Sequence, residues 1–246
     1  MAATMTLGVI GGTALETLPL ENREKREIKT PWGDPSGAVH CGAIGATRIA
    51  FINRHGDDHS IPPHGVNYQA NIAALQQFEV DAIIAVNAVG GINSAMVPGT
   101  LVLPDQLIDY TWGRAQSYSN SAVDVLRHVD FTSPYCAALR QQLQVVGRAQ
   151  NIELMVGGVH GVTQGPRLET AAEIVRMERD GCDLVGMTGM PEAALARELG
   201  IAYACIALVV NPAAGKSERE ITMAEIAAVM AKTAPKVVAL LTAFCQ

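Results

Sequence analysis

The stretch from Gln164 to Glu192 has the sequence QGPRLETAAEIVRMERDGCDLVGMTGMPE, and it shows the pattern on which the fold is built. A helix cannot absorb the turn Gly165-Pro166, whereas Ala171–Asp180 carries apolar residues at helical spacing. The short apolar run Asp183–Met187 then predicts a strand, and Pro191 lies where a second helix would begin. The stretch therefore predicts a helix–strand–helix unit of an α/β protein.

The ends of these predicted elements carry side chains that could hold a ligand. Glu169 comes just before the first helix, and Met187 and Thr188 follow the strand. The second helix begins close by, and a helix N-terminus suits an anion. Ordinary caps and turns use the same residue types, so this alternative stays open.

Length and composition predict one α/β domain over residues 1–246. Hydrophobic residues make up 49% of the chain, which argues against disorder. Predicted strands and helices alternate throughout, which favours a central, mixed sheet flanked by helices. The net charge of −6 argues against nucleic acid as a partner, so an anionic substrate would need a local basic site.

The cysteines and the apolar runs predict a cytoplasmic protein. Five cysteines are scattered without the spacing of a metal site, which is typical of free thiols in a reducing compartment. The N-terminus lacks the pattern of a signal peptide. The longest apolar stretches, such as Ile201–Val210, are too short to span a membrane. We therefore expect no membrane contact.

Polar or glycine-rich motifs follow three predicted strands. Thr6–Ile10 leads into Gly11-Gly12-Thr13, and Thr47–Asn53 leads into Arg54-His55. Asp81–Ala88 is nearly continuously apolar, as in a sheet covered on both faces, and ends at a glycine pair. Ligands bind at the carboxyl ends of such strands, and arginine offers phosphate a planar fork of donors. The same glycines would also occur in ordinary turns that bind no ligand, so this alternative stays open.

A second interpretation applies to the loop after Arg54. His55, Asp57, Asp58, His59 and His64 resemble a set of metal ligands. The loop contains two prolines, so no helix fixes the spacing of the histidines. A solvated loop, a metal site and a phosphate-binding loop are the three alternatives.

Other segments give simpler predictions. Asn22–Pro35 is charged and predicts a surface excursion, and Val66–Phe78 predicts an amphipathic helix. Leu154–Thr163 and Tyr203–Val210 predict strands. Thr222–Phe244 predicts a long final helix, with Thr222 as N-cap and Glu225 as its capping-box partner.

Several of these motifs occur together, in order, in a known family. They are Gly11-Gly12-Thr13, Asn53-Arg54-His55-Gly56, Val66-Asn67-Tyr68-Gln69-Ala70-Asn71, Asn87-Ala88-Val89-Gly90-Gly91, Gly165-Pro166-Arg167, and Gly186-Met187-Thr188 with Pro191-Glu192. With them the chain resembles the trimeric purine nucleoside phosphorylase and methylthioadenosine phosphorylase family. The resemblance implies a partly barrel-like sheet, a homotrimer, and reversible phosphorolysis of an N-glycosidic bond. It implies inorganic phosphate as co-substrate, and neither a cofactor nor a metal.

The resemblance also implies roles for individual residues. Phosphate contacts are implied for Thr13, Arg54, His55, Asn87, Ala88 through its backbone amide, and Thr188. Nucleoside contacts are implied for Leu168, Glu169, Met187, Asn211, Ala213 and Met223, with His128 reaching the site of a neighbouring subunit. Asn211 and His55 are the expected catalytic residues.

Two positions carry the expected choice of base. Adenine-using members of the family have Ser where this chain has Glu169, and Asp where it has Asn211 and Ala213. A carboxylate can accept the ring N–H of a 6-oxopurine, and an amide can face its carbonyl or accept a protonated N7. Adenine would oppose lone pairs to Glu169, which favours hypoxanthine.

One position carries the expected choice of sugar. Inosine-using members place a histidine near the ribose 5′-hydroxyl, and with one deletion allowed that position is Met223. A thioether cannot donate to a hydroxyl but suits a methylthio group. Ile226 and Ala227 would lie one turn along the same face. A core role for Met223 at the start of a helix is the alternative.

Together these positions predict S-methyl-5′-thioinosine as the substrate. Within the family the rivals are an inosine/guanosine phosphorylase and a methylthioadenosine phosphorylase. A metallohydrolase using the histidine-rich loop and a non-catalytic nucleoside sensor are rivals of other classes.

Overall fold

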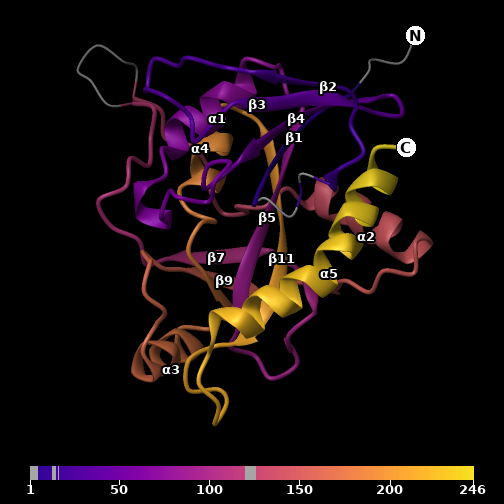
Figure 1. Ribbon diagram of the computed structural model, residues 1–246. Coiled ribbons are helices and arrows are strands. Elements are labelled where there is room, and N and C mark those ends of the chain that lie inside the picture. The colour runs from indigo at the N-terminus through magenta and orange to yellow at the C-terminus, as the bar shows by residue number, and fades with distance from the viewer. Residues whose placement is uncertain (1–4, 13–14, 16, 120–125) are drawn as a thin grey trace.

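A computed structural model describes residues 5–12, 15, 17–119 and 126–246 (Figure 1). Strands make up one mixed sheet in this part of the chain. They are β1 (Thr6–Gly11), β2 (Glu21–Arg26), β3 (Val39–Ile44), β4 (Thr47–Asn53), β5 (Ala82–Gly91), β6 (Leu101–Leu103), β7 (Gln106–Asp109), β8 (Met155–Val156), β9 (Val159–Val162), β10 (Leu184–Gly186) and β11 (Ala202–Pro212).

The sheet branches at β5, which is buried along most of its length. Its first half pairs in parallel with β1, and its last two residues pair antiparallel with β10. Along its whole length β5 also pairs in parallel with β11. The long path runs β2-β3-β4-β1-β5-β10-β9-β7, while β11 continues through β6 to β8. Ends of strands from both branches therefore meet beside β5.

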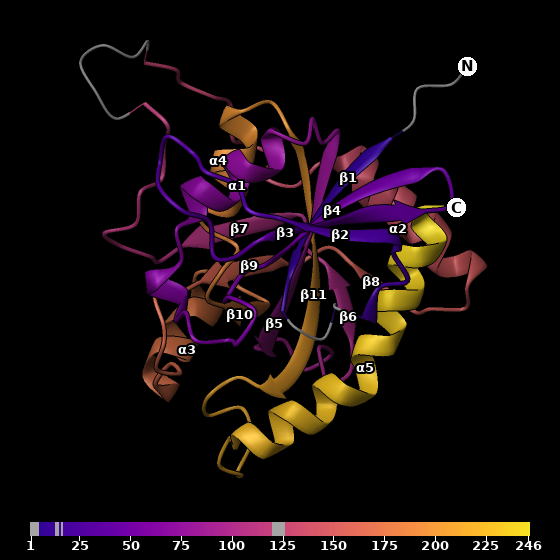
Figure 2. The same ribbon diagram turned by 45° about the horizontal axis from the view of Figure 1, so that its top comes forward.

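Helices cover both faces of the sheet (Figure 2). They are α1 (Tyr68–Gln76), α2 (Ala137–Ala149), α3 (Ala171–Arg179), α4 (Glu192–Glu198) and α5 (Met223–Phe244), with a short 3-10 turn at Pro63–Gly65. In both views α1, α3 and α4 lie on one side and α2 and α5 on the other. The expected α/β class with a large mixed sheet is thus confirmed.

Most predicted elements occur at or near the expected residues, and four differ. The charged segment after Asn22 forms β2, an edge strand whose six residues are all exposed. Helix α1 is almost wholly buried rather than amphipathic, because it packs against α4 as well as the sheet. The glycine pair Gly90-Gly91 continues β5 instead of ending it. A Cβ on Gly91 would lie 2.0 Å from the Met96 carbonyl oxygen, which explains the glycine there. Gly157-Gly158 divides the single strand expected before Gln164 into β8 and β9.

Helix α5 has the predicted N-cap, because the Thr222 hydroxyl accepts a hydrogen bond from the Glu225 backbone amide at 3.3 Å. The expected capping box is incomplete, because the Glu225 carboxylate bonds the Thr222 hydroxyl, at 3.1 Å, and not the Thr222 backbone amide. The expectation that no apolar segment could span a membrane was wrong on length, because α5 has 22 residues and is long and apolar enough to cross one. One such helix is weak evidence for a membrane span, because a core helix of a globular protein can be equally long and apolar. Here Val237, Leu240 and Leu241 are buried, and α5 packs on β11 and α2.

Candidate active site

A cavity of about 480 Å³ opens where β1, β4, β5, β10 and β11 end and α5 begins. It brings together ten of the predicted site residues from six separate segments. They are Arg54, His55, Ala88, Leu168, Glu169, Met187, Thr188, Asn211, Ala213 and Met223. The branching of the sheet at β5 is what gathers these segments.

Three predicted residues are not part of that lining. Thr13 lies outside the described residues, although its neighbour Gly12 lines the cavity. Asn87 is buried and contacts Thr188 from behind. His128 is exposed and does not line the cavity of its own chain, so its expected role in a neighbouring subunit stays a prediction.

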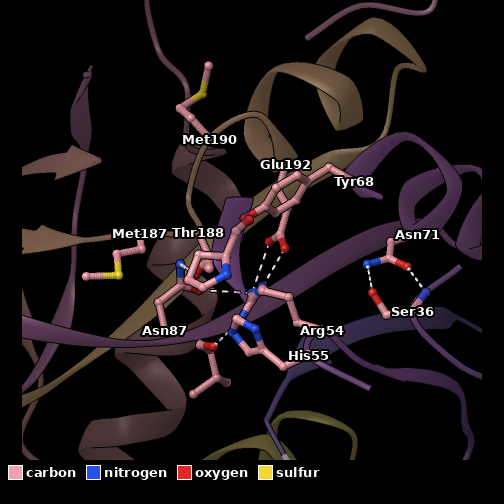
Figure 3. Close-up of polar contacts among 12 residues, drawn as sticks. Ser36, Arg54, His55, Tyr68, Asn71, Asn87, Met187, Thr188, Met190 and Glu192 are labelled. Atoms are coloured by element: carbon pink, nitrogen blue, oxygen red, sulfur yellow. Dashed lines mark hydrogen bonds and ion pairs between the residues drawn. The ribbon is translucent and has the colours of Figure 1, made fainter. Parts of the chain in front are cut away.

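Arg54 is held by a buried carboxylate at the floor of the cavity (Figure 3). Its Nε and Nη2 lie 2.5 and 3.0 Å from the two oxygens of Glu192, a side chain with no exposed surface. Burial alone would lower the pKa of the guanidinium, but the charge and hydrogen bonds of Glu192 outweigh it and raise the pKa. The arginine is therefore positioned before any ligand arrives.

Glu192 and Arg54 also organise their neighbours. The Tyr203 hydroxyl donates to Glu192 at 2.9 Å. Arg54 Nη1 donates to the Val86 carbonyl at 3.0 Å, and Nη2 donates to Asn87 Oδ1 at 3.2 Å. Because Oδ1 is an acceptor here, the Asn87 amide nitrogen donates to Thr188 Oγ1 at 3.0 Å. The hydroxyl proton of Thr188 stays available to a ligand.

His55 is half-buried beside Arg54, and one of its nitrogens is already engaged. Nδ1 lies 2.8 Å from the Ile61 carbonyl oxygen. Burial, and next the charge of Arg54, lower the pKa of His55 to about 4. The ring is therefore neutral at physiological pH.

The loop that follows His55 does not gather metal ligands. In the part of the chain that the structure describes, no three His, Cys, Asp or Glu side chains are grouped to hold an ion. Asp57 instead bonds Asn53 and Lys25, at 2.9 Å each, and His64 is exposed in the 3-10 turn. The metal-site alternative thus loses the side-chain grouping that it requires.

Glu169 and Asn211 both line the cavity. Glu169 lies one residue before Thr170, which is the actual N-cap of α3, and it accepts a hydrogen bond from Thr163 Oγ1 at 2.6 Å. Its second oxygen stays available. Asn211 is aimed by a register shift in the β5–β11 ladder, where Val209 pairs Val89 but Asn211 pairs Gly90. The extra residue, Val210, turns the strand at this point.

The far end of the cavity is apolar. Met223 begins α5 with 73% of its surface exposed, and Ile226 and Met230 line the same cavity one and two turns later. Met187 lines the same cavity, next to Thr188 (Figure 3). No described residue with a charged side chain lines the α5 end, so the cavity runs from a polar floor to an apolar mouth.

Sequence reasoning missed the structural roles of Glu192 and Arg114. Glu192 occurs in a quoted motif, but only its position at a helix start was apparent. Arg114 lies in a segment where no regular pattern stands out. Its guanidinium donates to the backbone carbonyls of Met187 and Gln164, each at 2.9 Å, and lies over the ring of Tyr68. It thereby ties together the loops after β9 and β10.

A buried histidine supports the second of those loops. His160 has no exposed surface, and Tyr135 is its hydrogen-bond partner, with the Tyr135 hydroxyl 3.2 Å from Nδ1. Its Nε2 has no partner among the described residues. A Cβ on Gly186 would lie 2.6 Å from that nitrogen, so the histidine ring occupies the space that the glycine leaves. Burial, and next Arg54, lower the pKa of His160 to about 3.

Comparison with known proteins gives consistent matches over nearly the whole chain. Residues 6–246 match the model of the phosphorylase superfamily. The chain is 52% identical over 225 residues to a probable S-methyl-5′-thioinosine phosphorylase of Xanthomonas campestris pv. campestris, covering 91% of this chain and 90% of the relative. It is 41% identical over 242 residues to the 6-oxopurine nucleoside phosphorylase of Pyrococcus furiosus, covering 96% and 91%. The crystal structure of methylthioadenosine phosphorylase from Schistosoma mansoni in complex with adenine is similar, with a TM-score of 0.91 and 32% identity over 98% of this chain and 91% of that one.

Proposed function

The chain belongs to the phosphorylase superfamily, and from this we propose that it catalyses reversible phosphorolysis of S-methyl-5′-thioinosine. The products are hypoxanthine and 5-methylthioribose 1-phosphate. The enzyme is a pentosyltransferase of the nucleoside phosphorylase type. One observation carries the choice of substrate: Glu169 and Asn211 share a cavity whose other end is formed by Met223 and its apolar neighbours.

The base end of the cavity supports a 6-oxopurine. The free oxygen of Glu169 accepts the ring N–H that hypoxanthine carries and adenine lacks. Asn211 donates to the 6-carbonyl or accepts from a protonated N7; in the structure its amide nitrogen donates to the Pro212 carbonyl at 2.7 Å. Mismatched buried polar groups are where discrimination becomes large, so adenine nucleosides are disfavoured.

The sugar end supports a 5′-methylthio group. Met223, Ile226 and Met230 offer apolar surface to a thioether but no donor to a 5′-hydroxyl. A hydroxyl placed there loses its hydrogen bonds to water without replacement. The same features support inosine less well, and an inosine phosphorylase is the second candidate because Glu169 and Asn211 would serve it equally.

The reaction follows from these positions. Phosphate is held by Arg54, His55 and Thr188, with the Ala88 amide and Thr13 completing its contacts, and it attacks the anomeric carbon. Asn87 lies outside the cavity lining and orients Arg54 and Thr188 through its hydrogen bonds. Positive charge develops on the sugar, which Met187 contacts, and negative charge develops on the leaving base. Asn211 stabilises the departing purine at N7, while Leu168 covers its face. The chemistry needs no metal and no covalent enzyme intermediate.

The assembly and location are part of the proposal. We propose a closed homotrimer in the cytoplasm, in which His128 of each chain completes the site of its neighbour. Nucleic acid and membrane have no role in this scheme. Light scattering at assay concentration tests the assembly, and an active monomer would contradict it.

A phosphorolysis assay tests the activity. Purified protein is given S-methyl-5′-thioinosine, methylthioadenosine, inosine or adenosine, with and without phosphate. We expect phosphate-dependent release of hypoxanthine, with the highest kcat/KM for S-methyl-5′-thioinosine. Equal efficiency with inosine would favour the second candidate. Turnover without phosphate, or its loss in chelator, would point to a hydrolase, and binding without turnover would point to a sensor.

A further inference from the structure

We infer that His55 makes the phosphate pocket selective for oxyanions that carry a proton. Hydrogen phosphate and hydrogen arsenate are such anions, and sulfate is not. The inference rests on the proposed function, because it assigns the phosphate subsite to this part of the cavity. It adds a specificity-determining role to a residue already expected to contact phosphate and to act in catalysis.

The first step is the direction of the hydrogen bond to Ile61. A backbone carbonyl can only accept, so His55 Nδ1, 2.8 Å from the Ile61 oxygen, must carry a hydrogen. In a neutral imidazole the other nitrogen then carries a lone pair. His55 lines the cavity, and Nδ1 is spent on Ile61, so Nε2 is the atom left to a ligand.

The second step is the charge of the ring. His55 is beside the positive Arg54, and the His59 ring centroid is 5.0 Å from its own. Both neighbours and burial act against a proton on Nε2. The hydrogen bond to Ile61 acts in the opposite direction, but it engages Nδ1 and not Nε2. His55 therefore meets the ligand as a hydrogen-bond acceptor.

The third step is the chemistry of the other groups. Thr188 has a hydroxyl proton to donate, because its oxygen already accepts from Asn87. Arg54 is the sole Lys or Arg among the described residues that line the cavity, and its charge is offset by Glu192. The pocket therefore recognises the ligand by matched hydrogen bonds more than by net charge. The donors suit bare oxygens, and the acceptor suits one P–OH group.

The consequence is a rule for which anions fit. Hydrogen phosphate presents three oxygens that accept and one that donates. Sulfate presents four that accept, so its oxygen would oppose the lone pair of His55. One unmatched polar contact in a buried site corresponds to a loss of about 10- to 100-fold in affinity.

The experiment compares anion binding in the absence of nucleoside. Isothermal titration at pH 8 and constant ionic strength measures the affinities of phosphate, arsenate and sulfate for the wild-type protein. We expect arsenate to bind within about threefold of phosphate, and sulfate at least about tenfold more weakly. Sulfate binding within threefold of phosphate would overturn the inference, as would failure to bind phosphate.

Two variants sharpen the result. In His55→Gln the side-chain amide can turn its NH₂ to the anion, so the ratio of phosphate to sulfate affinity should fall to about threefold or less. His64→Gln removes an exposed histidine outside the cavity and should keep the wild-type ratio. An undiminished ratio in folded His55→Gln would assign the selectivity to another group and overturn the inference. If His55→Gln does not fold, the wild-type comparison decides alone.

Failure of the two proposals can be told apart. A protein that selects phosphate over sulfate but does not cleave S-methyl-5′-thioinosine would remove the proposed function and keep the anion rule. A protein that cleaves the nucleoside but binds sulfate as tightly as phosphate would keep the proposed function and remove the anion rule.

Discussion

Replacing Glu192 with leucine should cost several kcal/mol of folding stability, because it leaves a guanidinium buried without its counter-charge. Both Glu192 oxygens contact Arg54, and one also accepts from the Tyr203 hydroxyl. In Glu192→Leu, Arg54 keeps its contacts to the Val86 carbonyl and Asn87. Tyr203 loses its partner.

The expected loss follows from two contributions. Removing one partner of a buried ion pair costs about 3–5 kcal/mol. Leaving a buried hydroxyl without a partner costs about 1–3 kcal/mol more. The total of about 4–8 kcal/mol is large beside the free energy of unfolding of about 5–15 kcal/mol of ordinary proteins. For a chain of this size it corresponds to a fall in Tm of roughly 8–30 °C.

The double variant separates charge from packing. Arg54→Met alone should destabilise by about 3–5 kcal/mol, because it strands Glu192. Arg54→Met with Glu192→Leu removes both charges, and apolar replacement of a whole buried pair is often neutral or stabilising. The double variant should therefore be more stable than either single one, yet bind phosphate no better than Arg54→Met.

Urea unfolding measures the stabilities, and titration with phosphate measures the loss of function. Lys29→Met is the matched control, because it breaks an exposed pair with Asp34 that water and salt already screen, so we expect little change in stability. A loss below 1 kcal/mol in Glu192→Leu would refute the reasoning about magnitude. A double variant as unstable as the single ones would refute the role of charge. Unchanged phosphate affinity in Arg54→Met would show that the phosphate site is misplaced.

Three further predictions concern the base, the sugar and pH. Replacing Glu169 by Ser, Asn211 by Asp and Ala213 by Asp should move the preference from 6-oxo to 6-amino nucleosides. The measurement is the ratio of kcat/KM values for the two classes of nucleoside. An unchanged ratio would show that the base binds elsewhere. We expect kcat/KM of the wild type to be about thirty- to several-hundredfold higher for S-methyl-5′-thioinosine than for inosine, because a hydrophobic gain and an unpaired hydroxyl are together worth about 2–4 kcal/mol. Met223→His should reduce this ratio of kcat/KM values. An unchanged ratio would assign the sugar pocket to other residues. His160 has a folded-state pKa of about 3, below the ordinary value of 6.5, so its stabilising effect is present above pH 6.5 and is lost as the pH falls toward 3. His160→Met should therefore reduce the slope of stability against pH between 6.5 and 5, which is at most about 1.4 kcal/mol per unit for one such group, and an unchanged slope in urea unfolding would contradict this.

The sequence predicted the elements best where local signals were strong. The strand Thr47–Asn53 and the capped start of α5 occur as expected, because an apolar run and an N-cap each act within a few residues. The structure at Gly90 and Gly91 was harder to predict from the sequence. Gly91 is needed because the backbone of Met96 approaches it closely, and a glycine of that kind cannot be told from a turn glycine by sequence alone. Strand β2 was missed because an exposed edge strand need not carry apolar residues.

The site was predictable as a set of residues but not as a network. Motifs carried by the family resemblance gave the residues that line the cavity. Nothing local distinguishes Glu192 from an ordinary acidic residue in the first turn of a helix, since its role depends on Arg54, 138 positions away in the chain. Arg114 is similar, because its acceptors are backbone carbonyls of loops far along the sequence. Long-range partners of this kind are set by the topology of the sheet.

The separate origins of the two ends of the cavity have a consequence for how such enzymes diversify. The residues proposed to contact the base come from the segment before α3 and the end of β11, whereas those proposed to contact the sugar substituent come from the first turns of α5. Substitutions at distant, non-touching positions combine nearly additively. A gene of this kind can thus change its base and its sugar in independent steps, keeping the shared phosphate floor intact. On this assignment the base preference and the sugar preference change by separate sets of substitutions.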